Sequence, residues 1–394
     1  MDANATTPVL PEVVDAMRPF WTEQFGNASS IHQRGQEARA AVDGARESLA
    51  RFLNCRPAEL VFTSGGTESD NMALLGVLAP GDHLITTAIE HHAVLHAAEA
   101  LAERGVEVTF LPCTPEGVVE VAALQAALRP NTRLVSVMFA NNETGAIQPI
   151  RELAEAAHSA GALFHTDAIQ AAGKLALDVK ALGVDLLSLS GHKMYAPQGT
   201  GALFVSRKVQ LKPMFFGGLH ERGRRPGTEN VAGIVALGKA AELASEWMAG
   251  RGASAGEGAP ANPAELAALR DRLEQGILAA VERAGINGGG APRTANTANL
   301  YFDGVEAEAL VIALDLKGLA VSGGSACQSG ATEPSHVLRA MGLSEARARA
   351  SVRFSLSRLN TETEVDAVVA MVPAAVARLR ELAPQKVVAA SAAD

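Results

Sequence analysis

The chain has 394 residues, 48% of them hydrophobic, and a formal net charge of −9 at pH 7. An acidic chain of this kind is a poor binder of nucleic acid, because phosphate recognition requires a basic face. The longest apolar run, residues 367–377, contains a proline and is far shorter than the ~20 residues that span a bilayer. Small-molecule chemistry without a membrane span is the expected class of function.

The first residues, MDANATTPVLPEVV, contain neither the basic nor the apolar segment of a secretion signal. We therefore expect a cytoplasmic protein. The three cysteines, Cys55, Cys113 and Cys327, form no CxxC pair, which argues against a disulfide framework or a thiolate metal cage.

Hydrophobic periodicity predicts an α/β fold. Within residues 30–53, one amphipathic helix is indicated by apolar residues at alternating spacings of four and three: Ala38, Val42, Ala45, Leu49 and Phe52. Helical patterns then separate several of the β-rich runs at 59–64, 82–88, 107–112, 133–140, 162–168, 185–190 and 201–206. This alternation predicts a mainly parallel seven-stranded sheet flanked by helices.

The stretch 249–265 is rich in Gly, Ala and Pro and marks a flexible connection. Beyond it, helices alternate with strands at 297–302 and 350–357, and Thr361 and Glu364 have the spacing of a capping box. We predict a large domain at 15–258 and a smaller α+β domain formed by 1–14 and 259–394.

A glycine pair in VFTSGGTESDN, residues 61–71, stands between a strand and a helix. Free backbone N–H groups and the helix dipole would face a phosphate there. An ordinary tight turn is the alternative, since Gly–Gly turns are common.

Lys193 ends the strand pattern in SLSGHKMYAPQGTG, close to Ser190 and His192. A partly desolvated lysine can act as a Schiff-base nucleophile. For a lone lysine, a surface position is the more common alternative.

Two further strand patterns contain charged residues. Asp167, followed by Gln170, ends one of them, and a buried carboxylate there requires a cation such as a protonated pyridine nitrogen. Otherwise Asp167 is a helix cap. Arg353 lies between Val352 and Phe354, so an inward guanidinium would meet a substrate carboxylate or form a structural salt bridge.

His91, His92 and His96 follow another strand pattern. The i, i+4 spacing of His92 and His96 suits a metal, but further ligands are missing nearby, so no metal is predicted. His91, at the junction, is better placed for stacking or proton transfer. Cys327 stands in AVSGGSACQSGATEPSH, where several glycines permit movement.

A phosphate cup, a carboxylate and a lysine together suit pyridoxal 5′-phosphate (PLP). At this point the sequence resembles the NifS/IscS-type (group I) cysteine desulfurases, which are fold-type I, class V aminotransferase-like PLP enzymes. The stretches that carry the resemblance are ATTPV (5–9), FGNASSIH (25–32), FTSGGTESDN (62–71), EHHAV (90–94), NNETG (141–145), HTDAIQ (165–170), SGHKMYAPQGTGAL (190–203), GGLHERGRRPGTENV (217–231), SGGSACQSGATEPSHVLRAMG (322–342) and SVRFSLS (351–357).

The resemblance implies a role for each matching position. Lys193 would form the Schiff base with PLP, Asp167 would pair with the pyridinium, and His91 would stack on the ring and act as acid/base. The remaining cofactor positions are Gly66, Thr67, Asn142, Gln170, Ser190, His192 and Thr228, the last from the partner subunit of a homodimer. The substrate positions are Arg353, Asn142 and Asn27, and Cys327 matches the catalytic cysteine.

The implied reaction converts L-cysteine to L-alanine and leaves the sulfur on Cys327 as a persulfide for an acceptor protein, in the synthesis of iron–sulfur clusters or other sulfur-containing cofactors. Selenocysteine lyase or another small-substrate PLP enzyme of the same fold is the alternative. Neither Cys55 nor Cys113 lies in a matching motif, so both are expected to be small buried residues.

Overall fold

The computed structural model describes residues 1–252, 256–323 and 333–382. In this part of the chain, the larger sheet has seven strands in the order β1-β7-β6-β5-β4-β2-β3. Its strands are β1 (Leu60–Thr63), β2 (His83–Thr87), β3 (Glu107–Leu111), β4 (Thr132–Ser136), β5 (Leu163–Asp167), β6 (Leu186–Ser190) and β7 (Gly201–Val205). Neighbours from β3 to β6 are parallel, and only β7 runs antiparallel, to both β6 and β1. The predicted mainly parallel seven-stranded sheet is confirmed.

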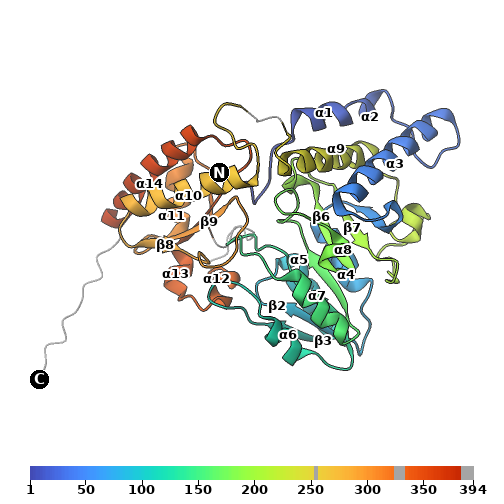
Figure 1. Cartoon of the computed structure of the whole chain (residues 1–394), viewed down its shortest axis with the longest axis horizontal. Coiled ribbons are helices and arrows are strands. Elements are labelled where there is room, and N and C mark those ends of the chain that lie inside the picture. Colours follow the sequence, from blue (N-terminus) through green and yellow to red (C-terminus); the bar gives the residue numbers. More distant parts are fainter. Residues whose placement is uncertain (253–255, 324–332, 383–394) are drawn as a thin grey trace, which may run out of the picture.

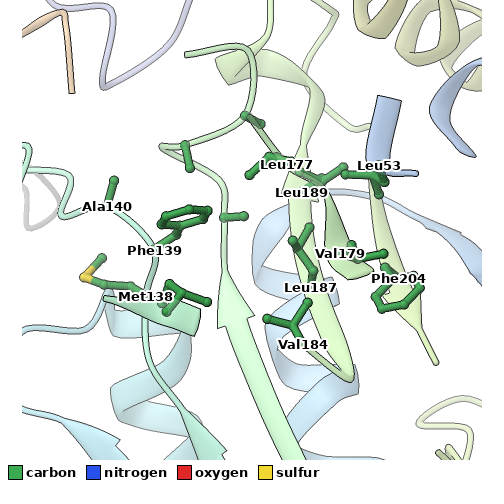
Figure 2. Close-up of a cluster of buried hydrophobic side chains, with 14 of the residues drawn as sticks. Leu53, Met138, Phe139, Ala140, Leu177, Val179, Val184, Leu187, Leu189 and Phe204 are labelled. Atoms are coloured by element: carbon green, nitrogen blue, oxygen red, sulfur yellow. The ribbon is translucent and has the colours of Figure 1, made fainter. Parts of the chain in front are cut away.

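Helices cover both faces of this sheet (Figure 1), so alternate residues of each strand enter different cores. One core joins α3 (Gln33–Leu53), α6 (Val121–Ala127), α7 (Ile150–Ser159) and α9 (Val231–Met248) to strand residues such as Phe62, Val135 and Leu187. Figure 2 shows part of this core, with Leu53 of α3 and Leu189 of β6 in one cluster.

The opposite core joins α4 (Gly66–Leu75) and α5 (His92–Glu103) to the intervening strand residues, which include Val61, Leu134 and Leu186. The amphipathic helix predicted within 30–53 is also confirmed, because α3 buries Ala38, Val42, Ala45 and Leu49.

A smaller antiparallel sheet has the order β10-β11-β9-β8 in the described residues. Its strands are β8 (Ala284–Ile286), β9 (Thr297–Phe302), β10 (Ser322–Gly323) and β11 (Ser351–Ser355). The sheet shares a separate hydrophobic core with α10 (Pro263–Ala280), α11 (Ala307–Asp315) and α14 (Glu362–Leu382). The sequence missed β8 and β10, since two or three residues are too short to show a period. The predicted domain boundaries stay a prediction.

The capping box that begins α14 is formed. Glu364 accepts from the Thr361 N–H at 3.0 Å, and the Thr361 hydroxyl accepts from the Glu364 N–H at 3.3 Å. The other short elements are α1 (Pro11–Met17), α2 (Pro19–Thr22), η1 (Pro57–Glu59), α8 (Val179–Leu182), η2 (Gly191–Lys193), η3 (His220–Gly223), α12 (His336–Ala340) and α13 (Glu345–Arg349).

The segment before α1 contacts both sheets. Asp2 forms a parallel bridge with Ser355 of β11, and the Thr7 N–H donates to the carbonyl of His192 in η2 at 3.0 Å. Residues 2–7 therefore connect the smaller sheet to the end of β6. No helix in the described ranges is long and apolar enough to cross a membrane.

Candidate active site

The ends of several parallel strands meet at one edge of the larger sheet. Since β7 is antiparallel to both β1 and β6, β1 runs in the same direction as β6. A cavity of about 280 Å³ opens at the carboxyl ends of these strands. It is lined by Asn4, Ala5, Gly66, Thr67, His91, Met138, Asn142, Asp167, Ile169, Gln170, Ser190, His192, Lys193 and Arg353.

Ten residues predicted from the sequence line this one cavity: Gly66, Thr67, His91, Asn142, Asp167, Gln170, Ser190, His192, Lys193 and Arg353. Asn27 and Thr228 are exposed and do not line it. Cys327 lies outside the described residues. The structure adds Asn4, Ala5, Met138 and Ile169, to which the sequence analysis assigned no role, although Ala5 and Ile169 lie in stretches that carry the resemblance.

Lys193 ends η2, directly after β6. Its Nζ donates to the main-chain carbonyl of Ala5 at 2.7 Å and also to that of Asn4. Both acceptors are neutral carbonyl oxygens, so these contacts hold the amine at the cavity wall without adding a negative charge. The amine stays available as a nucleophile once it loses its proton.

Asp167 is the last residue of β5 and is only 4% exposed. Burial raises the pKa of this carboxyl to about 6, while the Ile169 N–H, which donates to it at 2.8 Å, and the Lys193 charge act in the opposite direction. Burial and the charge of Asp167 also raise the pKa of Asp70 well above its ordinary value. Of these two carboxyls, Asp167 is therefore the one that favours the charged form, and a carboxylate there can pair with a cationic ring.

The glycine pair forms a cradle at the start of α4. Gly65 has φ of 155° and offers no side-chain cap, so N–H groups of the first turn are free to bind an anion. A Cβ on Gly66 would lie 2.0 Å from Cδ1 of Ile169, so this position accepts only glycine without displacing Ile169. The hydroxyl residues Thr67 and Ser190 line the same part of the cavity.

His91 caps α5, where its Nδ1 accepts from the Ala93 N–H at 3.1 Å. The proton of the neutral ring therefore resides on Nε2. Burial, aided by the charges of His92 and Lys193, lowers the pKa of His91 to about 4. At neutral pH the ring is uncharged and suited to stacking.

His92 and His96 lie on α5 with their ring centroids 5.0 Å apart. Among the described residues, no group of three or more His, Cys, Asp or Glu side chains is arranged to hold a metal ion. Cys55 and Cys113 lie outside the cavity, and burial disfavours the thiolate form of both. Burial raises the pKa of Cys55 to about 12 and raises that of Cys113.

Arg353 extends from the centre of β11 and its side chain is only 4% exposed. Its Nη1 donates to the carbonyl of Asn142 and its Nη2 to the carboxylate of Asp2, both at 2.9 Å. The buried Nε has no hydrogen-bond partner among the described residues. Because Arg353 also lines the cavity, its guanidinium suits a carboxylate ligand there.

Gln170 has its amide orientation fixed from two sides. Its Nε2 donates to the carbonyl of Asn4 at 3.0 Å, and its Oε1 accepts from Nζ of Lys174 at 2.9 Å. Burial lowers the pKa of Lys174 to about 7. The sequence did not single out Lys174, because a lysine in a loop carries no signal of burial.

The whole site lies within a region that matches one known family model, Aminotransferase class-V, over residues 1–368. The chain belongs to this aminotransferase class-V family. The cysteine desulfurase IscS of Anaeromyxobacter sp. (strain Fw109-5) is 50% identical over 98% of this chain and 94% of that protein.

Two solved structures are also similar. A NifS-like protein has a TM-score of 0.87 at 34% identity, over 96% of this chain and 99% of the other. SspA in complex with cysteine has a TM-score of 0.78 at 36% identity, over 90% and 97%. The predicted NifS/IscS-type, fold-type I assignment is confirmed, and with it the PLP cofactor of the family.

Proposed function

We propose that this chain is a PLP-dependent cysteine desulfurase that removes sulfur from L-cysteine and releases L-alanine. The observation that carries the proposal is a single cavity shared by four groups: an anion cradle at Gly66, the carboxylate of Asp167, the amine of Lys193 and the guanidinium of Arg353. The relatives named cysteine desulfurase support it.

The residues of the cavity fit the cofactor. The first turn of α4, with Thr67, Ser190 and His192, would bind the phosphate. Asp167 would bind the protonated ring nitrogen, and its burial makes such a cation favourable there. Lys193 would hold the aldehyde carbon, His91 would stack on the ring, and Asn142 and Gln170 would contact the ring oxygen or the substrate.

When bound, PLP withdraws electrons from the substrate Cα. Lys193 would take the Cα proton, and the guanidinium of Arg353, which lines the cavity, would receive the substrate carboxylate. The thiolate of Cys327 would then attack the substrate sulfur. In the balanced reaction, L-cysteine and one thiol yield L-alanine and one persulfide, because the carbon–sulfur bond breaks as the sulfur–sulfur bond forms.

The enzyme is proposed to be a homodimer in which Thr228 completes the partner's phosphate site. Thr228 is exposed and lies outside the cavity of its own chain. Two large apolar side chains in the preceding segment, Phe216 and Leu219, are 92% and 87% exposed, which supports a covered surface there. Asn27 stays a predicted substrate contact.

A sulfur acceptor protein and a cytoplasmic location complete the proposal. The acceptor would serve iron–sulfur cluster or other sulfur cofactor synthesis. Cell fractionation tests the location, and transfer of labelled sulfur from L-cysteine to a captured protein tests the acceptor.

The deciding experiment measures alanine and sulfide from L-cysteine, with a reductant present, in the wild type and in Cys327→Ala. We expect equal amounts of both products from the wild type and none from the variant, while the cofactor absorption is kept. Cys55→Ala is the matched control and should retain full activity. Sulfide release that survives Cys327→Ala contradicts the proposal, and a strong preference for L-selenocysteine would favour a selenocysteine lyase.

A further inference from the structure

An acidic side chain from the start of the chain lies against the guanidinium of Arg353. Oδ1 of Asp2 accepts from Nη2 of Arg353 at 2.9 Å, although 351 positions separate the two residues. The arginine side chain is 4% exposed and the aspartate side chain 22% exposed. This is a partly buried ion pair beside the cavity that would bind substrate.

Asp2 is fixed in this position by the smaller sheet. Its backbone forms a parallel bridge with Ser355 of β11, and the following Ala3 N–H donates to the Ser355 carbonyl at 2.9 Å. Its second oxygen, Oδ2, accepts from the hydroxyl of Ser322 at 2.9 Å, and Ser322 is itself the register partner of Arg353. The backbone pairing with β11 and the Ser322 hydroxyl together hold the carboxylate beside Arg353.

We propose that Asp2 is a positioning residue that holds the guanidinium of Arg353 in the orientation required for the α-carboxylate of the substrate. The inference rests on the proposed function, in which Arg353 receives that carboxylate. It assigns to Asp2 a part in selecting substrates that carry a carboxylate over otherwise similar amines.

The donor arrangement of Arg353 gives the reason. Asp2 and the Asn142 carbonyl each engage one terminal nitrogen, which fixes the plane of the guanidinium and leaves Nε without a protein partner in the described residues. A guanidinium whose plane is already fixed by two protein acceptors loses less conformational entropy when a carboxylate binds. Asp2 also offsets the charge of a buried arginine before the substrate arrives.

Asp2 is anchored too firmly to act as a displaceable competitor for the substrate. A competitor and a positioning residue predict opposite results, because removal of a competitor tightens substrate binding and removal of a positioning residue weakens it. Asparagine at position 2 separates geometry from charge, since its amide oxygen can still accept from Arg353 and its amide nitrogen can donate to the Ser322 hydroxyl.

The test uses the full-length protein loaded with PLP, in the wild type, Asp2→Ala and Asp2→Asn. Two ligands, L-alanine and L-alaninamide, are titrated while the visible absorption of the bound cofactor is followed, and KM and kcat are measured with L-cysteine. L-Alaninamide lacks the carboxylate, so its affinity reports on the parts of the site other than the carboxylate contact. Asp15→Ala is the matched control, because Asp15 of α1 forms an exposed ion pair with Arg18, the residue after the helix.

We expect Asp2→Ala to weaken L-alanine binding and raise KM by about tenfold, with kcat changed by less than about twofold. Binding of L-alaninamide should not change, and Asp2→Asn should stay within about threefold of the wild type in all quantities. Unchanged or tighter L-alanine binding in Asp2→Ala overturns the inference, as does an equal loss of L-alaninamide binding.

If Asp2→Ala does not fold, Ser322→Ala decides the question, because it removes only the contact to Oδ2. We expect about threefold weaker L-alanine binding there, with the L-alaninamide affinity retained; no change overturns the inference. A failure of the proposed function shows separately, as a wild type that releases no sulfide from L-cysteine while the ligand titrations still report on Asp2.

Discussion

The amine of Lys193 donates to the main-chain carbonyl of Ala5 at 2.7 Å, across 188 positions of sequence. A second bond joins the same amine to the Asn4 carbonyl. The lysine that ends η2 is therefore held by the segment that precedes α1, and this segment forms one wall of the candidate active site. The contact explains how a lysine in a Gly- and Ser-rich turn acquires a defined place.

Lys193→Ala should remove the visible absorption of the bound cofactor and lower turnover of L-cysteine by about a thousandfold or more, because no other residue would supply the covalent attachment. Absorption spectra after gel filtration and an alanine assay check this. Lys208→Ala is the matched control, since Lys208 is an exposed lysine just beyond β7. A coloured, active Lys193→Ala protein would contradict the assignment.

Gly66→Ala should weaken PLP binding by about tenfold, because the new Cβ would lie 2.0 Å from Cδ1 of Ile169 at the phosphate cradle. Titration of the cofactor-free protein with PLP measures the dissociation constant. Ile169→Val removes that Cδ1, so the double variant should recover part of the loss. If the two effects simply add, the steric explanation is wrong.

His91→Phe should retain PLP and lose about tenfold or more in kcat, because phenylalanine keeps the ring and removes the proton-transferring nitrogens. The lowered pKa of His91, about 4, means that the protonated ring is a minor form, about a tenth at pH 5 and far less at pH 8. The pH profiles of wild type and variant should therefore have the same shape in this range.

Kinetics at saturating L-cysteine from pH 5 to 8 provide the measurement for His91. His96→Phe is the control, since His96 is exposed on the same helix, α5. If kcat changes with pH in the wild type and this change is lost only in His91→Phe, the ring titrates between pH 5 and 8. That result would contradict the lowered pKa of His91.

Glu90→Gln should make stability less dependent on pH. Glu90 is fully buried, and burial raises its pKa from 4.5 to about 8, whereas Oε1 accepts from Thr87 and the Met138 N–H at 2.8 Å. The folded protein therefore keeps a proton that the unfolded chain releases above about pH 4.5. This difference in proton binding between the folded and unfolded chain lowers the free energy of unfolding as the pH rises from 4.5 to 8.

Glutamine keeps the accepting oxygen and does not titrate. We expect urea unfolding at pH 5, 6.5 and 8 to show a free energy of unfolding that rises, relative to the wild type, by up to about 1.4 kcal/mol per pH unit in the variant. Glu47→Gln, at an exposed position of α3, should follow the wild type. If the free energy of unfolding of the variant instead falls relative to that of the wild type as the pH rises, the raised pKa of Glu90 is not the cause.

Much of the fold could be predicted because burial leaves a periodic trace in the sequence. The amphipathic face of α3 follows such a period, the seven strands of the larger sheet appear as short β-rich runs, and all were found. The strands β8 and β10 were missed, because they are three and two residues long and are defined by pairing with β9 and β11.

In the candidate site, too, some residues could be predicted from the sequence and others could not. The sequence by itself determined the residues at the strand ends, such as Asp167 and Lys193, because strand carboxyl ends converge in a parallel sheet and the family motifs fall there. Only the tertiary structure decided that Asn4 and Ala5 would hold Lys193 and that Asp2 would meet Arg353. Periodicity records the local environment of a residue, whereas contacts across hundreds of positions depend on how the two sheets and the N-terminal segment pack together.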